Sequence, residues 1–230
     1  LELLKACVHF GHQRSRWHPK MAPFLFGARN GVHIINLEET QKKLALALAF
    51  LKQSSAEGKL ILFVGTKDQA KDIVKKYATD CGMPYVTERW LGGLLTNYTT
   101  ISALLKKVRK LKTDQESGEL ATKYTKSETV KFGKYIEKME KTLFGMLNLE
   151  RKPDVLFLVD IKKEKTAFKE AIATGVKTVA ICDSNVNPEQ IDYMIPANDD
   201  AIKSIDLITR LASEAIKEGK AQAAQLSNAA

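Results

Sequence analysis

The chain has 230 residues, of which 44% are hydrophobic and 27% charged, and its formal net charge is +9. This composition supports a folded core and excludes wholesale disorder. The longest apolar run, residues 44–51, is far shorter than the roughly 20 residues that a membrane-spanning helix needs.

Strands and helices alternate over the first hundred residues. Asn36 and Glu39 have the spacing of a capping box at the start of one helix, and Thr66 and Gln69 repeat that spacing at the next. A continuous apolar run (LILFV) is typical of a central parallel strand that is covered on both faces. The pattern predicts strands at 32–36, 60–64 and 85–86, and helices at 37–57 and 66–80.

Residues 101–150 interrupt this alternation. Apolar side chains recur three and four residues apart in two runs, and a polar stretch that contains Gly118 separates the runs. This heptad spacing predicts an antiparallel helical hairpin, paired as a coiled coil, that projects from the sheet domain. The expected seam residues are Ile101, Leu104, Val108 and Leu111 on one helix and Phe132, Ile136, Met139, Leu143 and Met146 on the other.

Alternation resumes after residue 152. Strands are predicted at 155–159 and 178–182, with a helix between them that Gly175 ends. Pro188 is expected to open a short helix, because proline is favoured in the first turn. A long last helix is expected over residues 200–218, ending at Gly219.

Together these elements predict an α/β fold, a doubly wound, mainly parallel five-stranded sheet with helices on both faces. We expect residues 1–100 and 151–220 to form one discontinuous sheet domain, with a basic N-terminal extension at residues 1–31. Residues 101–150 are expected to form the inserted coiled-coil hairpin, and residues 221–230 a frayed tail.

Positive charge is unevenly distributed along the chain. Residues 1–60 carry nine basic and four acidic residues, and residues 101–152 carry thirteen and seven. Residues 153–230 carry nine basic and twelve acidic residues, so this last third is expected to face a protein neighbour or solvent. Basic charge concentrated in this way favours a polyanion such as nucleic acid, although a solvated lysine-rich surface is the plainer alternative.

Two segments place basic and aromatic side chains together. Residues 13–20 (QRSRWHPK) interleave arginines, which can form paired hydrogen bonds to phosphate, with a tryptophan that could stack on an unpaired base. Residues 88–97 (ERWLGGLLTN) contain paired glycines, where backbone could approach a partner closely, and Thr96 or Asn97 can cap the helix that follows. Both segments could instead pack over the sheet, and for Trp17 and Trp90 we favour a place in the core.

The predicted carboxyl ends of the strands allow an enzyme interpretation. Gly65 and Lys67 could hold a phosphate there, and Asp160 or Asp183 could serve in acid–base or metal chemistry. However, no predicted strand is followed by a Gly-x-Gly-x-x-Gly or phosphate-loop motif. We therefore favour helix capping by Thr66 and the aspartates.

All four histidines fall within the first 33 residues. His9 and His12 could approach Asp183 and hold a metal, but metal sites usually have more ligands at closer spacing, so we expect none. Contact with RNA and ordinary packing are the alternatives for these histidines. The cysteines lack paired spacing, which argues against a disulfide framework, and all three are expected to be buried: Cys7, Cys81 and Cys182.

Six ordered motifs lie between residues 9 and 202. They are residues 9–13 (HFGHQ), 17–21 (WHPKM), 26–37 (FGARNGVHIINL), 92–97 (GGLLTN), 153–157 (PDVLF) and 191–202 (IDYMIPANDDAI). In this order they resemble the family of the universal second protein of the small ribosomal subunit, in its bacterial form. The departures are minor, since His18 and Ala197 stand where that family is expected to have Asn and Gly.

The resemblance implies a structural, non-enzymatic constituent of the small ribosomal subunit without a cofactor, located in a bacterial cytoplasm or, alternatively, in an organelle. It implies an α/β domain with a protruding helical hairpin. The implied partners are small-subunit ribosomal RNA and neighbouring ribosomal proteins, including the large mRNA-binding first protein of the subunit, with no membrane and no homo-oligomer. The candidate RNA-binding residues are Arg14, Arg16, Trp17, Lys20, Arg29, Asn30, Arg89, Asn97, Lys106, Lys107, Arg109, Lys110, Lys131 and Lys134.

Two other functions stay open at this point. One is an α/β enzyme or regulator that binds a nucleotide or sugar phosphate at the carboxyl edge of the sheet. The other is an RNA-binding regulator that acts outside the ribosome and uses the same basic surfaces.

Overall fold

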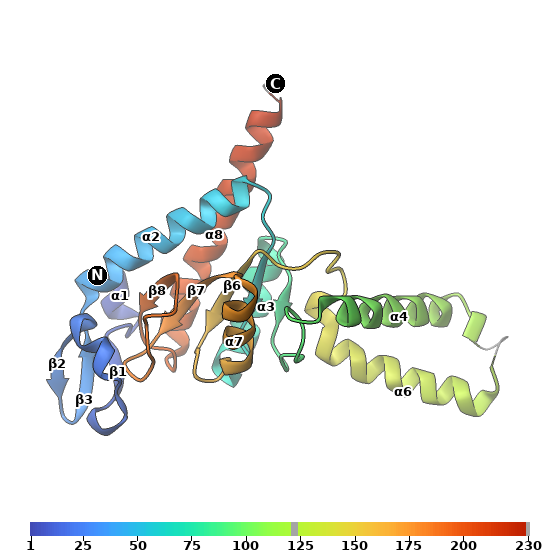
Figure 1. Cartoon of the computed structure of the whole chain (residues 1–230), viewed down its shortest axis with the longest axis horizontal. Coiled ribbons are helices and arrows are strands. Elements are labelled where there is room, and N and C mark those ends of the chain that lie inside the picture. Colours follow the sequence, from blue (N-terminus) through green and yellow to red (C-terminus); the bar gives the residue numbers. More distant parts are fainter. Residues whose placement is uncertain (121–123, 229–230) are drawn as a thin grey trace.

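A five-stranded parallel sheet forms the centre of the molecule in the computed structural model, which describes residues 1–120 and 124–228 (Figure 1). Every residue of β4 and β6 is buried, as expected of central strands covered on both faces. This confirms the predicted α/β fold class. In sheet order the strands are β5 (Tyr85–Val86), β4 (Ile61–Val64), β6 (Val155–Val159), β7 (Lys177–Cys182) and β8 (Tyr193–Pro196).

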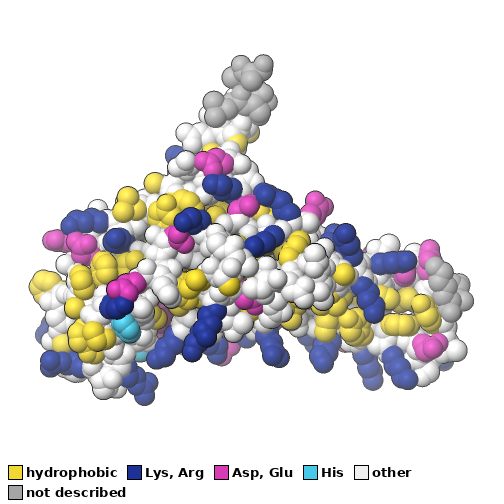
Figure 2. Space-filling view, viewed as in Figure 1, with side chains coloured by type: hydrophobic (Ala, Val, Ile, Leu, Met, Phe, Trp, Pro, Cys, Tyr) yellow, Lys and Arg dark blue, Asp and Glu magenta, His cyan; other side chains and the backbone are white. Residues whose placement is uncertain are grey.

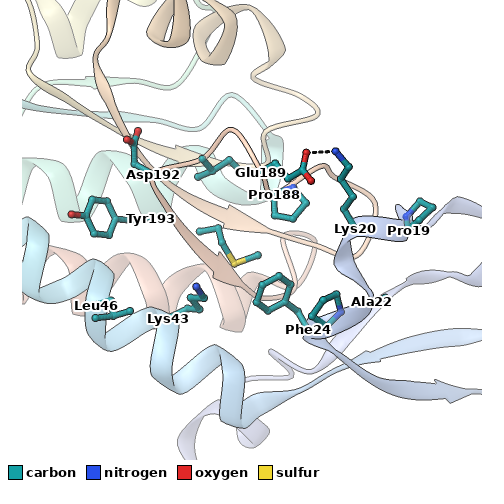
Figure 3. A pocket seen from close by; sticks show the side chains of 13 residues that line it. Pro19, Lys20, Ala22, Phe24, Lys43, Leu46, Pro188, Glu189, Asp192 and Tyr193 are labelled. Carbon is teal, nitrogen blue, oxygen red and sulfur yellow. Dashed lines mark hydrogen bonds and ion pairs between the residues drawn. The ribbon is translucent and has the colours of Figure 1, made fainter.

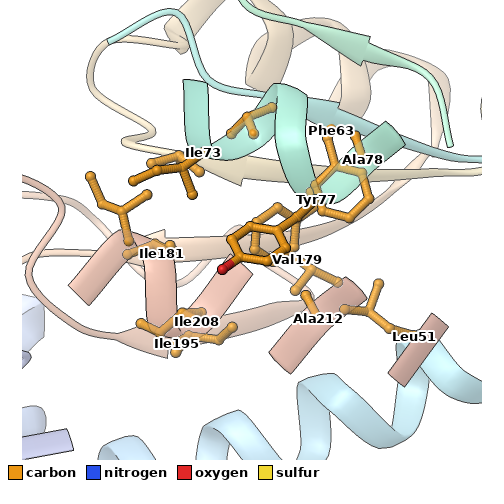
Figure 4. Close-up of a cluster of buried hydrophobic side chains, with 14 of the residues drawn as sticks. Leu51, Phe63, Ile73, Tyr77, Ala78, Val179, Ile181, Ile195, Ile208 and Ala212 are labelled. Carbon is orange, nitrogen blue, oxygen red and sulfur yellow. The ribbon is translucent and has the colours of Figure 1, made fainter. Parts of the chain in front are cut away.

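Helices cover both faces of this sheet and form two hydrophobic cores. On one face, α2 (Leu37–Ala56), α3 (Asp68–Asp80) and α8 (Ile202–Asn228) pack on the strand residues around Phe63 and Val179, and Tyr77 of α3 reaches into the same cluster (Figure 4). On the other face, α7 (Lys165–Thr174) packs beside the base of α4 (Tyr98–Glu116). No helix among the described residues is long and apolar enough to cross a lipid bilayer.

The predicted strand at 32–36 does not belong to the parallel sheet. It is β3 (Val32–Ile35), the middle strand of a separate antiparallel sheet between β1 (Phe10–Gln13) and β2 (Leu25–Arg29). Asn30 and Gly31 connect β2 to β3 with φ angles of 50° and 78°. Two positive φ angles in an Asn-Gly pair define the tight turn of an antiparallel hairpin, and this turn overrides the parallel placement.

The fifth strand of the main sheet is instead β8, and the short helix predicted after Pro188 is absent from this described region. Turns occupy that region and lead into β8 at the edge of the sheet. An edge position tolerates Pro196 at the end of the strand, because one side of an edge strand needs no ladder hydrogen bond.

The inserted hairpin projects away from the sheet (Figure 1). It consists of α4, α6 (Lys126–Leu143) and the short η3 (Phe144–Met146), and Lys112 joins the two long helices through an ion pair with Glu140 at 2.7 Å. In the expected seam Leu105, rather than Leu104, is fully buried, while Leu104 packs at the margin of the core. Residues 121–123 of the connection lie outside the described part.

The last helix does not end at Gly219, and the expected fraying from residue 221 is wrong through Asn228, where α8 ends. A Cβ at Gly219 would lie 2.2 Å from the Lys52 carbonyl oxygen. Glycine therefore allows α8 to approach α2 closely instead of terminating the helix. Residues 229–230 are outside the described residues.

Three short elements complete the N-terminal region: α1 (Glu2–Lys5), η1 (Arg14–Arg16) and η2 (Pro19–Phe24). Cys81 and Cys182 are buried as expected, but Cys7 is only half-buried. It follows α1 at a φ of 59°, in the turn that leads toward β1.

Candidate nucleic-acid interface

The predicted basic residues of the N-terminal region converge in space. Arg14 and Arg16 lie in η1, and the backbone N–H of Arg14 donates to the carbonyl of Gly31 at 2.9 Å. This bond sets η1 beside the β2–β3 turn, which carries Arg29 and Asn30. We call the four residues Arg14, Arg16, Arg29 and Asn30 the N-terminal basic surface.

The three arginines of this surface are accessible to a binding partner. All are exposed, and among the described residues none forms an ion pair with an acidic side chain. A guanidinium with no internal carboxylate keeps its paired donors for an external anion such as phosphate.

The main sheet anchors the N-terminal segment that carries these arginines. Ser184, which follows β7, accepts a hydrogen bond from the His12 N–H on its hydroxyl at 2.8 Å and from the His18 N–H on its carbonyl at 2.8 Å. A Cβ at Gly11 would lie 2.9 Å from the Ser184 hydroxyl oxygen, so the approach is close. These contacts connect the small sheet to the large one.

Two other candidates of this region are placed differently from the arginines. Trp17 is 38% exposed and its ring lies 5.1 Å from that of His33, so the expectation of a core position was wrong. Lys20 forms an ion pair with Glu189 at the rim of an apolar pocket of about 680 Å³ (Figure 3). The positive charge of Lys20 is therefore already matched within the chain.

A buried carboxylate holds the loop between β5 and the hairpin. Glu170 of α7 accepts hydrogen bonds from Trp90 Nε1 at 3.0 Å and from the backbone N–H groups of Gly93, Leu95 and Thr96 at 2.8, 3.0 and 3.3 Å. Burial acts to raise the pKa of Glu170, but these hydrogen bonds outweigh it and hold the pKa below its usual range.

The fixed loop leaves Arg89 and Asn97, its two basic or polar candidates, exposed. Trp90 is buried, as favoured from the sequence, whereas the neighbouring Arg89 is exposed. Asn97 occupies the N-cap position of α4 without capping a backbone N–H, and its side-chain oxygen accepts from the hydroxyls of Thr99 and Thr100.

The hairpin presents a row of exposed lysines. We call Lys106, Lys107, Lys110, Lys131 and Lys134 the hairpin basic surface; all five are exposed, and no ion pair involves them in the described part of the chain. Arg109, the remaining hairpin candidate, is half-buried, and its Nε is buried without a hydrogen-bond partner. Arg109 therefore differs from the lysines around it.

The carboxyl edge of the large sheet is anionic. The neighbouring strands β4 and β6 run outward from the point where the chain order reverses, which is where doubly wound sheets bind ligands. Lys67 Nζ lies there, 3.1 Å from Asp160, 3.0 Å from Asp199 and 2.5 Å from Asp200. Burial acts to lower the pKa of Lys67, but the three carboxylates raise it above its usual range. One lysine amid three carboxylates does not attract a phosphate, so this geometry disfavours the nucleotide-binding alternative.

Glycine at position 65 also has a packing reason. A Cβ there would lie 2.8 Å from Val74 Cγ2 of α3. Thr66 does not cap the next helix as expected, because its N–H and hydroxyl both donate to Glu164 at 2.7 and 2.6 Å. Gly65 and Thr66 thus serve the packing of α3 and α7 against the sheet.

Two of the three metal candidates come together beside this edge. His12 Nδ1 lies 3.1 Å from Asp183, and ligand atoms of His12, Asp183 and Asp199 all lie within 4.8 Å of one another. Burial raises the pKa of Asp199 to about 7, and repulsion from Asp160 and Asp183 adds to the shift. This nitrogen and oxygen donor set could hold a divalent cation such as zinc. His9 is not part of the group.

Sequence reasoning missed Ser184 and Asp199 as functional neighbours of the N-terminal segment. Their partner His12 is more than 170 residues away in the chain, and no local spacing links them. The only signal was that Asp199 lies inside the motif at residues 191–202.

Comparison with known proteins adds independent information. The family model described as ribosomal protein S2 matches residues 3–219. The small ribosomal subunit protein uS2 of Coprothermobacter proteolyticus is 45% identical over 219 residues, which cover 95% of this chain and 81% of that protein. The uS2 protein of Fusobacterium nucleatum subsp. nucleatum is 45% identical over 218 residues, which cover 95% of this chain and 88% of that protein.

Proposed function

This chain belongs to the ribosomal protein S2 family, and from that premise we propose that it contacts small-subunit ribosomal RNA through the N-terminal basic surface and the hairpin basic surface. As a member of the family it is a structural constituent of the small ribosomal subunit, whose partners are ribosomal RNA and other ribosomal proteins. Arg89, Asn97, Trp17, Lys20 and Arg109 are secondary contact candidates of this proposal.

The observation that carries the proposal is the exposure of unpaired arginines on both sides of the β2–β3 turn. Arg14 and Arg29 come from segments that a backbone hydrogen bond joins, so their guanidinium groups are presented from one rigid support. Lysine and arginine neutralise phosphates and release bound counterions, so binding should weaken steeply as salt rises. Contacts of this kind fix position on RNA, while specificity comes from RNA shape and from neighbouring proteins.

The protein partner of the finer proposal is the large mRNA-binding first protein of the subunit. Phe26 is 80% exposed and Phe10 is 44% exposed, on the two outer strands of the small sheet, β2 and β1. Exposed aromatic side chains are typical of the anchors of protein interfaces. The substitution Phe26→Ala is expected to reduce retention of that protein on purified subunits without changing the incorporation of this chain. Unchanged retention would remove this surface from the proposal.

The proposal further holds that the chain has no enzymatic activity and acts in the cytoplasm of a bacterium. The anionic carboxyl edge around Lys67 supports the absence of a phosphate-binding reaction at the position where this fold class usually places one.

We also propose that residues 1–100 with 151–220 and residues 101–150 are separate folding units, which limited proteolysis with mass analysis of the fragments would test.

Sedimentation tests the main proposal. Tagged protein in a lysate is expected to migrate with small subunits at low salt and to dissociate at high salt, because its contacts are electrostatic. Charge reversal at Arg14 and Arg16 is expected to impair incorporation into subunits more than charge reversal at the matched pair Lys177 and Lys217, whose partners are Asp192 and Asp80. Equal incorporation of the two variants would refute the assigned surface, and a free-monomer peak under both salt conditions would refute RNA contact.

A further inference from the structure

The turn into α7 and its first half form an unpredicted basic surface. Four lysines of this segment, Lys162, Lys163, Lys165 and Lys169, are exposed, and we call them the α7 lysine patch. The segment belongs to the last third of the chain, where acidic residues outnumber basic ones. Net charge therefore gave no reason to expect a positive surface here.

In this segment the acidic side chains are buried and the lysines are exposed. Its three acidic residues point inward: Asp160 is 9% exposed, Glu164 is 3% exposed and Glu170 is 9% exposed. Asp160 pairs with Lys67, and Glu164 accepts hydrogen bonds from Thr66. Glu170 accepts from Trp90 and the loop before α4. All three carboxylates are used inside the molecule, and in the described part of the chain none of them forms an ion pair with these lysines.

The lysines are consequently unmatched at the surface. Within residues 1–120 and 124–228, no ion pair involves any member of the α7 lysine patch. Lys165 and Lys169 are four residues apart in α7, so they lie on one face of the helix about 5–6 Å apart, and Lys162 and Lys163 lie in the turn just before them.

Helix stability does not explain these lysines. Positive charge in the first turn of a helix opposes the helix dipole, and Lys162, Lys163 and Lys165 all lie at or just before the start of α7. The N-cap residue Glu164 is buried and bonded to Thr66, and the first turn contains no acidic residue. The placement of these lysines costs a little stability in the free protein, so it suits a partner that supplies negative charge.

Position in the fold points to the kind of partner. In Figure 1, α7 lies between the small antiparallel sheet and the projecting hairpin, and Glu170 joins α7 directly to the loop before α4. Figure 2 shows Lys and Arg side chains along the lower edge of the molecule from the small sheet, over α7, to the hairpin. The α7 lysine patch thus fills the interval between the N-terminal basic surface and the hairpin basic surface.

We propose that the α7 lysine patch contacts phosphates of ribosomal RNA and joins the two basic surfaces into one continuous RNA-binding face. This inference rests on the proposed function and adds a third contact surface to it. A row of lysines with exposed Thr166 among them suits phosphates better than a protein, because protein interfaces are depleted in lysine and enriched in aromatic side chains.

The test compares two variants with the same change in charge. In the first, Lys162, Lys163, Lys165 and Lys169 are all replaced by glutamine. In the control, Lys52, Lys59, Lys177 and Lys217 are replaced by glutamine; each of these lysines forms a surface ion pair elsewhere on the molecule. Binding of the purified full chain to small-subunit ribosomal RNA is measured at several salt concentrations.

The logarithm of the affinity falls as the logarithm of the salt concentration rises, and each lost phosphate contact makes this slope less steep by about 0.7 to 0.9. If two to four of the lysines contact phosphate, affinity near 0.15 M salt falls by roughly 14- to 900-fold on the same relation, while the control stays close to the wild-type protein. Because all four side chains are exposed, both variants are expected to fold, which circular dichroism checks.

Three outcomes overturn the inference in distinguishable ways. Equal slopes for the two variants, with a wild-type protein that binds RNA, refute the patch and leave the proposed function standing. Wild-type protein that fails to bind RNA at any salt concentration refutes the proposed function as well. Normal RNA binding by the first variant, with loss of a neighbouring protein from assembled subunits, assigns the patch to a protein partner instead.

Discussion

The sharpest test of how the sheet domain positions the hairpin is the substitution Glu170→Gln. The carboxylate of Glu170 accepts four N–H donors, from Trp90 Nε1 and from the backbone of Gly93, Leu95 and Thr96. Glutamine keeps the shape but turns one acceptor oxygen into an NH₂ group that faces these donors. At least two N–H groups then lose their partner in a buried site, and each costs about 1–3 kcal/mol.

We therefore expect Glu170→Gln to lower the free energy of unfolding by about 3 kcal/mol at pH 7. Urea unfolding followed by circular dichroism measures this change. The matched control is Glu218→Gln, which removes one side of the exposed Lys52–Glu218 pair and should cost less than about 1 kcal/mol. A loss for Glu170→Gln no greater than that of the control would refute the assigned role.

Two further readouts separate this role from general packing. The folded-state pKa of Glu170 is lowered, so its stabilising effect is fully present above the ordinary glutamate pKa of about 4.3 and is lost as pH falls through the lower folded value. The difference in stability between wild type and Glu170→Gln should shrink over that acidic interval. At neutral pH, the Leu95 amide, which donates to Glu170, should exchange with solvent about 100-fold faster in the variant if the local loss is near 3 kcal/mol.

Two further predictions concern glycines and a buried charge. Gly219→Ala should destabilise the protein by about 1–3 kcal/mol, because the added methyl group would clash with the Lys52 carbonyl. Gly133→Ala in α6 should stabilise the protein by about 0.5–1 kcal/mol, because only the Gln115 side chain lies near the added methyl group. Thermal unfolding of the two variants checks that the two effects have opposite signs. Lys67→Met should lower the free energy of unfolding by about 3–5 kcal/mol, because Asp160 and Asp199 lose their shared buried cation, and urea unfolding at neutral pH with no loss would contradict that role for Lys67.

Continuous apolar runs made three of the five parallel strands predictable, and β5 was placed from the turn residues Gly82 and Pro84 before it. Residues 61–64 and 155–159 are wholly apolar, and their short length and β-branched content favour central strands that are buried on both faces. The edge strand β8 escaped prediction because it is short, ends in Pro196 and follows turns that resemble a helix start. The small antiparallel sheet carried a readable signal in Asn30-Gly31, but the apolar run after it was assigned to the wrong sheet.

Charge was harder to predict than strand placement. Glutamate is rarely buried, so sequence alone gives no reason to place Glu164 and Glu170 inside the fold. Their burial depends on hydrogen bonds to Thr66 and Trp90, which are distant in the chain. The convergence of Arg14 and Arg29 likewise depends on the pairing of β1 with β3 and on the Arg14–Gly31 hydrogen bond, which no spacing rule describes. Local patterns predict elements, whereas long-range hydrogen bonds decide which charges reach the surface.

The order of the strands also constrains how the chain folds during its own synthesis. β4 has two neighbours in the sheet, and one of them, β6, begins at Val155, far beyond the hairpin. When β4 and β5 have emerged from the exit tunnel, the edge of β4 that pairs with β6 is still open. The contacts of the hairpin helices are local in sequence. These helices can therefore form before β6 is available to pair with β4. Nascent chains that stall before Val155 should therefore bind general chaperones, and release of that binding should coincide with the appearance of β6 and β7.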